Sequence, residues 1–367
     1  MRILLLGHAP SVHVQRWADA LAARGHEIRL LTTDDAPGAR WPGREVGRRF
    51  PLAALRIASA RGAVRRELGS FRPDVTVAHF LADYGFLGAI AGARPLAVAC
   101  WGSDLLINAR ATPLHRLRAG FVLRRAGLIH VDAAMLAEAA IALGAPPARV
   151  WTRPWGVDAD GLAPERPWEE RRRDSGVARI LWTRQLLPLY DPETLLEALG
   201  LLRARGVPFR ATIAGDGALR ARLEARARDL GMTDAIRFAG FVSDEALRAL
   251  YREHEIYVSL SRSDSTSQSL LEAMAAGLLP IVTDIAGNRE WVTHRREGIL
   301  VPPGDAEAVA AAVAEAVSPA ANGAPADPLA DFPAMVRAAR EAVARRARFA
   351  DTVAQIEARL AGLAGRR

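Results

Sequence analysis

Short apolar runs alternate with amphipathic stretches in the first half of the chain. The apolar runs predict buried strands at residues 3–6, 28–32, 74–79, 96–100 and 128–131. Between them, apolar side chains recur at helical spacing; Val14, Trp17 and Leu21 share one face of a helix that Gly25 ends. Helices are expected at residues 12–24, 53–71, 84–93 and 114–125. This alternation is typical of a parallel, doubly wound sheet.

The pattern breaks after residue 158 and then starts again. Residues 159–178 contain Pro164 and Pro167 and show no periodicity, which predicts a linker. Strands follow at residues 179–182, 209–214, 236–239, 256–260 and 279–283, and helices at residues 193–205, 219–230, 244–253 and 306–317. Residues 318–327, rich in proline, alanine and glycine, predict a loop, and residues 334–363 predict one long amphipathic helix.

We therefore expect an α/β protein with two tandem Rossmann-like domains. The first spans residues 1–160, a linker spans residues 161–178, and the second domain spans residues 179–333. The C-terminal helix, residues 334–367, is expected to pack back toward the N-terminal domain. Ligands of open parallel sheets bind beyond the carboxyl ends of the strands, so the two domains are expected to face a central cleft.

Residues 261–290 carry the clearest chemical signal. An apolar strand runs into a hydroxyl-rich loop, and strong helix formers begin at Leu270. Hydroxyl side chains cap helices, and the N-terminus of a helix favours a phosphate. Asp264 and Glu272 flank this cap, which contains Ser265, Thr266, Ser267 and Ser269. The arrangement suits a sugar nucleotide, although an ordinary capped strand–loop–helix unit has the same pattern.

Composition narrows the class of protein. At 367 residues, half of them apolar, the chain is long enough for two domains. It has no apolar run of about 18 residues, and its N-terminus enters a strand–turn–helix pattern rather than a signal peptide. Cys100 is the only cysteine, which excludes an internal disulfide and a cysteine metal cluster. A cytoplasmic location is therefore expected.

The net charge of +8 lies entirely in the first half of the chain. Residues 1–160 carry 21 arginines against 13 acidic residues, whereas residues 161–367 carry 28 of each. The sequence contains no lysine, which excludes a P-loop lysine, a Schiff-base lysine and a lysine general base. A phosphate must therefore be bound by arginine, backbone N–H groups or hydroxyls.

The arginine-rich helices of the first half leave two interpretations open. They fit a solvated helix face, and they equally fit peripheral contact with an anionic membrane at its inner side. These arginines are Arg61, Arg65, Arg66, Arg116, Arg118, Arg124 and Arg125. No basic stretch is interleaved with aromatic side chains, so nucleic-acid binding is not expected.

Several short motifs follow one another along nearly the whole chain. They are Gly25-His26-Glu27, Trp101-Gly102-Ser103-Asp104, Trp155-Gly156-Val157-Asp158, Gly215-Asp216-Gly217, Phe238-Ala239-Gly240, Glu272-Ala273-Met274-Ala275-Ala276-Gly277 and Gly298-Ile299-Leu300-Val301. In this order and spacing the chain resembles the GT-B glycosyltransferases, and within them the retaining group 1, or family 4, enzymes. The resemblance implies transfer of a sugar from a nucleoside diphosphate sugar, with retention at the anomeric carbon and with neither a metal nor a cofactor.

The resemblance also implies donor-binding roles in the second domain. Glu272 matches the glutamate that holds the ribose hydroxyls, and Asp264 replaces a glutamate that contacts the donor sugar. Arg184 matches the arginine on the diphosphate, but Leu189 and Tyr190 stand where the family has a companion lysine. We expect the hydroxyl of Tyr190, the helix cap and an arginine of the first domain to compensate for the lysine. Two further donor-binding positions, beside the nucleotide and its base, are Gly215 and Phe238.

The acceptor side is expected in the first domain. Three candidates lie in the first strand–helix loop and the start of its helix, namely Ser11, His13 and Arg16. His79 ends one strand and fits either a core or a functional role. Trp101 ends the next strand, where many relatives have an active-site histidine, so Asp104 becomes the leading carboxylate of this domain. The acceptor itself is expected to be a sugar, a lipid-linked molecule or a small molecule.

The predicted catalytic residues are Asp104, His13, Arg184 and Asp264. Donors fixed around the diphosphate stabilise the negative charge that develops on the leaving group. Asp264 and Glu272 are assigned to different parts of one ligand, so they are not the close carboxylate pair of a retaining glycosidase. The resemblance therefore implies a front-face displacement, in which the leaving phosphate helps to deprotonate the acceptor.

Rival functions remain open at this point. A sugar-nucleotide epimerase or phosphorylase of the same fold would need a different set of active-site residues. An inactive sugar-nucleotide-binding protein would fit the missing lysine and the tryptophan at position 101. A dehydrogenase is excluded, because no G-x-G-x-x-G follows the first strand. Asp158-Ala159-Asp160 mimics a metal-binding motif, but its place at the end of the first domain indicates a linker.

Overall fold

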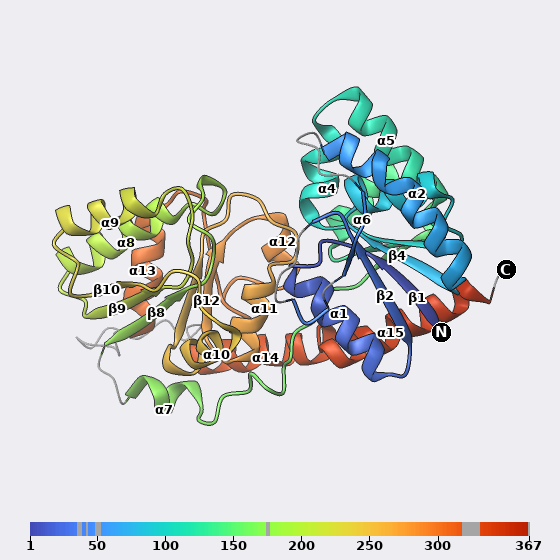
Figure 1. The fold of residues 1–367 in the computed structure, drawn as a ribbon. Helices are drawn as coiled ribbons and strands as arrows, with labels where there is room; N and C mark the ends of the chain where they lie inside the picture. The colour runs from blue at the N-terminus through green and yellow to red at the C-terminus, as the bar shows by residue number, and fades with distance from the viewer. Residues whose placement is uncertain (35–38, 42, 48–52, 174–176, 318–330, 366–367) are drawn as a thin grey trace. The chain divides into compact units, whose positions relative to one another are not determined.

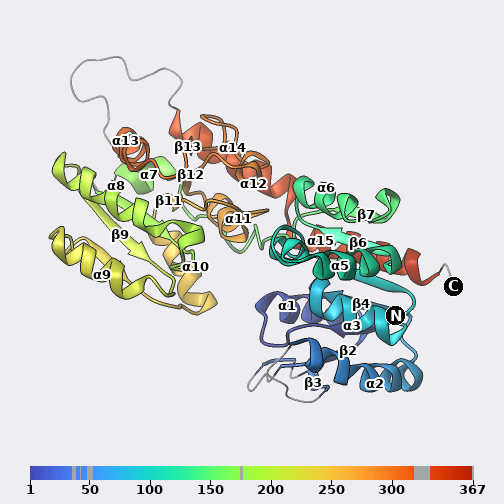
Figure 2. The ribbon, with the colours of Figure 1, turned by 90° about the horizontal axis from the view of Figure 1, so that it is seen from above.

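The computed structural model describes residues 1–34, 39–41, 43–47, 53–173, 177–317 and 331–365. The chain forms two compact units, one comprising Met1–Pro154 with Ala350–Arg367 and the other comprising Trp155–Phe349. Each unit holds one parallel sheet with helices on both faces (Figure 1 and Figure 2). The predicted α/β class and the two Rossmann-like domains are therefore confirmed. Among the described residues, every helix is too short or too polar to cross a membrane.

The first unit contains a seven-stranded sheet in the order β3-β2-β1-β4-β5-β6-β7. Its strands are β1 (Arg2–Leu6), β2 (Glu27–Thr32), β3 (Arg44–Glu45), β4 (Val75–His79), β5 (Leu96–Ala99), β6 (Leu128–Val131) and β7 (Val150–Thr152). Its helices are α1 (Val12–Ala23), α2 (Ala53–Phe71), the π-helix η1 (Leu81–Gly85), α3 (Phe86–Ala91), α4 (Gly102–Leu106), the short 3-10 helices η2 (Asn108–Arg110) and η3 (Pro147–Arg149), α5 (Pro113–Arg125), α6 (Ala134–Ala142) and α15 (Phe349–Ala364).

Helices cover the first sheet on both faces. Strands β4, β5 and β6 are buried at every position, which explains their continuous apolar runs. Leu4 and Leu6 pack with apolar side chains of α2, α3 and α5, while the alternate positions Ile3 and Leu5 face the other way. On that opposite side lie α1 and α15 (Figure 1).

The second unit contains a six-stranded parallel sheet in the order β10-β9-β8-β11-β12-β13. Its strands are β8 (Ala178–Trp182), β9 (Phe209–Ile213), β10 (Ile236–Phe238), β11 (Ile256–Ser259), β12 (Leu279–Thr283) and β13 (Ile299–Val301). Its helices are α7 (Trp168–Arg173), the 3-10 helix η4 (Pro188–Tyr190), α8 (Pro192–Ala204), α9 (Arg220–Asp229), α10 (Asp244–Glu253), α11 (Gln268–Ala275), α12 (Ala286–Arg289), α13 (Ala306–Val317) and α14 (Phe332–Arg346).

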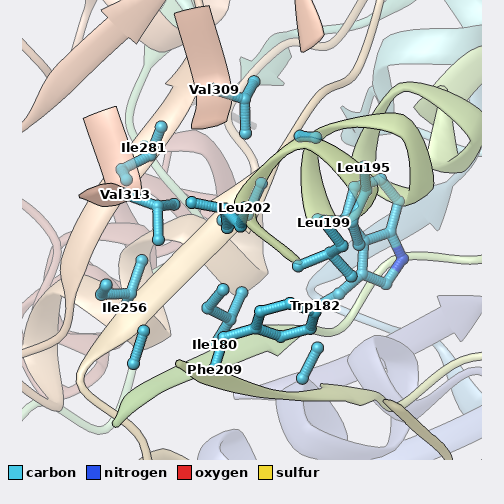
Figure 3. Close-up of a cluster of buried hydrophobic side chains, with 14 of the residues drawn as sticks. Ile180, Trp182, Leu195, Leu199, Leu202, Phe209, Ile256, Ile281, Val309 and Val313 are labelled. Carbon is cyan, nitrogen blue, oxygen red and sulfur yellow. The ribbon is translucent and has the colours of Figure 1, made fainter. Parts of the chain in front are cut away.

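Two apolar layers fix the second sheet. On one face, leucines of α8 and valines of α13 pack over strand side chains such as Ile180, Trp182 and Ile256 (Figure 3). On the other face, α10, α11 and α14 pack over Leu181, Tyr257 and neighbouring strand residues. The sheet is therefore rigid where its strands end, and those ends carry the candidate site described below.

The prediction of one long C-terminal helix over residues 334–363 is wrong. The structure has two helices there, α14 and α15, which separate at Ala347 and Arg348. Val157 donates its N–H to the carbonyl of Ala347 at 2.8 Å and accepts the N–H of Phe349 at 2.9 Å. This pairing replaces the hydrogen bonds of a continuous helix, so a tertiary contact interrupts an unbroken amphipathic pattern. The second piece, α15, belongs to the N-terminal unit, where Glu357 contacts Arg24 and His26.

Other elements differ from the prediction as well. The stretch predicted to be aperiodic at residues 159–178 contains the short helix α7, because Trp168 is buried and donates its indole N–H to the carbonyl of Glu255 at 2.9 Å. The short elements α4, α6, β3, β7, α12 and β13 were also not predicted. The loop predicted for residues 318–327 lies outside the described residues.

Candidate active site

The second sheet reverses its strand order between β8 and β11. From β8 the chain builds outward through β9 and β10, and β11 then pairs with the other side of β8. In open parallel sheets such a switch point leaves a crevice at the carboxyl ends of the strands, where ligands bind. The loops that follow β8 and β11, residues 183–191 and 260–267, contain most of the predicted donor-binding residues.

Arg184 links these two loops. One terminal nitrogen donates to Oδ2 of Asp264 at 2.6 Å, and the other donates to the hydroxyls of Ser267 at 2.9 Å and Ser269 at 3.2 Å. Its guanidinium lies 4.2 Å from the centre of the Tyr190 ring. Burial alone would lower the pKa of Arg184, but the charge of Asp264 raises it above its ordinary value. Arg184 is therefore a fixed, permanently charged group at the switch point.

The helix cap that the sequence predicts is present. Ser267 is the N-cap of α11, and its hydroxyl accepts the N–H of Leu270 at 3.3 Å. Asp264 accepts the N–H of Ser265 at 3.0 Å, so both of its oxygens are engaged. Thr266 is buried beside the indole of Trp291. The N-terminus of α11, a favourable place for an anion, therefore lies beside the guanidinium of Arg184.

Glu272 lies one turn further along α11. Its side chain is half-buried and accepts the hydroxyl proton of Tyr251 at 3.1 Å. Burial, followed by the charge of Glu272, raises the pKa of Tyr251 well above its usual range, so this phenol remains a donor. A second phenol, Tyr257, donates to Ser269 at 2.8 Å. Glu272 and Asp264 thus lie on different segments with different partners, as predicted.

Two glycines allow the backbone to close around Arg184 and Asp264. A side chain at Gly215 would collide with the carbonyl oxygen of Arg184, and one at Gly287 would collide with the carbonyls of Asp264 and Ser265. Gly215 was predicted to lie near the nucleotide, whereas Gly287 was missed. Gly287 lies in the short helix α12, which was not predicted. The glycine itself was therefore the only sign in the sequence that the backbone is approached closely there.

Phe238 has a less direct position. It ends β10 and packs, half-buried, against the apolar core of the second unit. Its contact with a nucleotide base stays a prediction. The acidic pair Asp158 and Asp160 has no metal-like geometry: each carboxylate pairs with an arginine, Arg248 and Arg348 respectively. Within the described ranges, no group of His, Cys, Asp or Glu side chains could hold a metal ion.

The first unit brings most of its predicted acceptor residues into one aromatic cluster. The ring of His13 lies 4.7 Å from that of Trp101, and His79 lies 6.1 Å from the same indole. Trp17 contacts His79 at 5.9 Å and His130 at 5.8 Å. Trp17 was predicted only as part of the apolar face of its helix, and His130 was not singled out. His130 is the last residue but one of β6, near the same end of the sheet at which His79 ends β4, and this position was the available signal.

Burial keeps these imidazoles neutral. It lowers the pKa of His13 to about 4, with a further contribution from Arg16, and lowers the pKa of His79 to about 3. The pKa of His130 falls to about 4 for the same reason. Ser11 is the half-buried N-cap of α1, next to the cluster in sequence. His79, His130 and Trp17 are buried, so the half-buried rings of His13 and Trp101 are the uncharged groups that the cluster exposes.

Asp104 has a structural role that the sequence did not reveal. Its side chain is fully buried, and Oδ2 accepts the N–H groups of Leu81 at 2.7 Å and Trp101 at 3.1 Å. Asp104 thereby closes the first turn of α4 and ties it to η1. Burial raises its pKa to about 8, so the carboxyl carries a proton at neutral pH. A direct role of Asp104 in catalysis stays a prediction.

Comparison with known proteins identifies the family. Residues 169–321 match the family model described as glycosyl transferases group 1, and residues 9–156 match the model of a glycosyl transferase 4-like domain. The chain belongs to the group 1 glycosyltransferases. The predicted resemblance is thus confirmed, and an epimerase or phosphorylase is not favoured.

Two relatives illustrate the match of this group 1 chain. It is 31% identical over 179 residues to the amylovoran biosynthesis glycosyltransferase AmsK of Erwinia amylovora. The aligned residues are 47% of this chain and 42% of AmsK. It is 28% identical over 319 residues to a GDP-mannose-dependent alpha-mannosyltransferase of Mycobacterium tuberculosis, and this alignment covers 78% of each chain. Among solved structures, Anabaena HepE in complex with UDP aligns with a TM-score of 0.80 and 18% identity over 99% of this chain and 100% of HepE. This last likeness shows the GT-B fold.

We predict that Gly215→Ala disturbs the donor site through Arg184. The new Cβ would push the carbonyl of Arg184 away and lower the free energy of unfolding by about 1–3 kcal/mol. Gly200→Ala in the middle of α8 is the matched control, because its nearest neighbour would be Leu230 at 3.6 Å; it should raise stability by about 0.5–1 kcal/mol. Urea unfolding measures both. Equal stability of Gly215→Ala and the parent would contradict the close approach.

A second prediction concerns the pH dependence of stability. The unfolded chain ionises Asp104 near pH 4, whereas the folded chain keeps the proton up to about pH 8. Unfolding therefore releases a proton between these values, and the free energy of unfolding falls by up to about 1.4 kcal/mol per pH unit as pH rises. Asp104→Asn keeps an acceptor oxygen but lacks this titration. Urea unfolding from pH 5 to 8 should show the parent losing stability relative to Asp104→Asn; parallel curves would contradict the prediction.

Proposed function

We propose that this protein is a retaining glycosyltransferase that moves a sugar from a nucleoside diphosphate sugar to an acceptor hydroxyl. The observation that carries the proposal is the position of Arg184, fixed at the switch point beside the N-terminus of α11. A guanidinium and the free N–H groups of a helix together bind a diphosphate. The family match supports the reaction class, and the UDP of the HepE structure supports the type of donor.

The remaining side chains of this crevice are assigned to parts of the donor. Glu272, half-buried with Tyr251 on one oxygen, accepts the ribose hydroxyls. Asp264 lies at the cap beside Arg184 and contacts the transferred sugar. The ring of Tyr190 stacks on the guanidinium of Arg184 and orients that guanidinium toward the phosphates.

The chemistry follows from where charge develops. Breaking the bond between sugar and phosphate places negative charge on the diphosphate, and Arg184 with the α11 N-terminus stabilises that charge without a metal or cofactor. A double displacement would need a free carboxylate as nucleophile. Both oxygens of Asp264 are engaged, by Arg184 and by the N–H of Ser265, and Asp104 is fully buried. We therefore assign a front-face displacement in which the leaving phosphate takes the acceptor proton.

The acceptor site is assigned to the neutral cluster of the first unit. Uncharged imidazoles and indole faces suit the hydroxyls and apolar faces of a sugar. His13 lies at the start of α1 with Ser11 and Arg16, and its ring contacts Trp101, which in turn lies near His79. Relatives named for amylovoran and colanic acid biosynthesis support a cell-envelope polysaccharide or lipopolysaccharide as the product; a glycosylated natural product is the second choice.

The test of the donor assignment is Arg184→Gln. Removing the charge next to the leaving diphosphate should lower kcat/KM for the donor by about 100-fold or more. Arg203→Gln, which breaks an exposed pair with Asp234 at 2.8 Å, is the matched control and should retain activity. The assay follows sugar transfer from UDP-, GDP-, ADP- and TDP-sugars with and without EDTA, and NMR of the product reports the anomer. Inversion, dependence on a metal, or full activity of Arg184→Gln would contradict the proposal; binding without turnover would favour an inactive binding protein.

We further propose that the first unit docks on an anionic membrane to reach a lipid-linked acceptor. Three large apolar side chains are exposed after α4 and in the first turns of α5: Ile107 at 56%, Leu114 at 72% and Leu117 at 68%. Residues 105–131 carry five arginines and no acidic residue. Apolar side chains among uncompensated arginines suit the interface of an anionic bilayer. This surface specifies which of the predicted arginine-rich helices makes the contact.

The membrane proposal predicts binding to vesicles. The protein should float with vesicles of phosphatidylcholine and phosphatidylglycerol but not with phosphatidylcholine alone. Leu114→Ser with Leu117→Ser should weaken this binding about tenfold or more, because two exposed leucines lose their contact with the bilayer. Leu55→Ser, which changes an exposed leucine of α2, is the control. Equal flotation of both variants would contradict the surface, and loss of a dimer in the double variant would assign it to a second copy of the chain.

A further inference from the structure

A second arginine reaches the crevice between β8 and β11. Arg262 lies in the loop after β11, and its backbone N–H donates to the carbonyl of Leu189, in the loop after β8, at 2.9 Å. Its guanidinium lies 2.9 Å from Oδ2 of Asp191. The Arg262 side chain is 60% exposed, whereas Asp191 is only 4% exposed. The guanidinium is therefore held by a buried anchor while most of it faces solvent.

The two arginines form a reciprocal pattern. Arg184 starts in the loop after β8 and reaches Asp264 in the loop after β11. Arg262 starts in the loop after β11 and reaches Asp191 in the loop after β8. Each loop thus contributes one arginine whose guanidinium pairs with a carboxylate of the other loop. Two guanidinium groups therefore lie at the switch point.

The anchors differ in a way that matters for a ligand. Arg184 is 12% exposed, and both of its terminal nitrogens already have partners. Asp191 holds Arg262 through one terminal nitrogen, so other N–H groups of this fork can bind an anion. Asp191 itself stays in place: it is buried, adopts φ of 52° and forms the N-cap of α8. Arg262 is thus oriented by its partner and remains accessible.

Arg184 alone has few N–H groups left for a diphosphate. The charge of Arg184 is offset by Asp264 at 2.6 Å, and the hydroxyls of Ser267 and Ser269 already accept from Arg184. A diphosphate brings about two to three negative charges. The chain has no lysine to add, and Tyr190 serves as the stacking partner of Arg184. Arg262 is the exposed cation of these two loops.

We infer that Arg262 is the second phosphate-binding residue of the donor site and takes the place of the absent lysine. This inference rests on the proposed function, because it assumes a nucleoside diphosphate donor. It adds Arg262 to the groups expected to make up for that lysine, which are Tyr190, the α11 cap and an arginine of the first domain. It also explains why Asp191, an acidic residue, is buried beside the crevice: it orients Arg262 rather than meeting the ligand.

The test compares Arg262→Gln, Arg262→Lys and the control Arg203→Gln. Calorimetry with UDP, GDP, ADP and TDP identifies the best nucleoside diphosphate for the parent, and ligand-observed NMR measures the matching nucleoside. Arg262→Gln should weaken the diphosphate about tenfold or more and leave the nucleoside unchanged, since only the phosphates lose a charged partner. Arg262→Lys should restore part of the affinity, and Arg203→Gln should bind like the parent.

Each outcome separates the two claims. Unchanged diphosphate affinity in Arg262→Gln overturns the role of Arg262 and leaves the proposed function standing. Equal losses for diphosphate and nucleoside also overturn it, because they indicate that Arg262 only braces the two loops. A parent protein that binds none of the four diphosphates overturns the proposed function together with this inference. Thermal melting without ligand confirms that each variant is folded.

Discussion

The ion pair between Arg184 and Asp264 is the contact on which the rest of the proposed donor site depends. Both side chains are largely buried, at 12% and 18% exposure, so neither charge is well solvated without the other. Through this pair the loop after β8 is tied to the loop after β11, and through Ser267 it is tied to the N-terminus of α11. Gly215 and Gly287 permit the approach of the surrounding backbone. Losing either charge would leave its partner buried and unpaired, and the crevice would lose its shape together with its charge.

The two units solve the problem of buried polar groups differently. The second unit holds opposite charges in pairs and leaves a helix terminus and a cation for an anionic ligand. The first unit also pairs a buried carboxylate, Glu67, with Arg29 and Arg44, but the polar groups around its aromatic cluster are neutral. There the pKa values of His13 and His79 fall to about 4 and 3, and the pKa of Asp104 rises to about 8. A charged donor and an uncharged acceptor hydroxyl match this division of chemistry.

The sequence predicted the sheets well because their strands are covered on both faces. Such strands appear as continuous apolar runs, and the helices between them keep one apolar stripe. The same reasoning failed at residues 347–348, where Val157 interrupts a helix whose pattern continues unbroken. A contact between segments nearly two hundred residues apart leaves no trace in local periodicity. The structural role of Asp104 was not predicted for a similar reason, since only the fold shows that it caps α4 in full burial.

The part of the candidate site that is formed by residues close together in the sequence was predictable. The spacing of Asp264, Ser267 and Glu272 around a helix start is visible in the sequence, and these residues lie where that pattern requires. Arg262 was not singled out, because its role depends on β8 and β11 being neighbours in the sheet. The order of strands cannot be predicted from the local pattern of apolar and polar residues. The strand order, rather than any motif, brings the two arginines together.

Hydrogen–deuterium exchange over the whole chain, with and without a nucleoside diphosphate, tests the central claim most directly. Ligand should slow exchange in peptides covering residues 183–191 and 260–272, the two loops and the start of α11. Protection confined to other segments, with these two unchanged under saturating ligand, would contradict the assignment of the donor site.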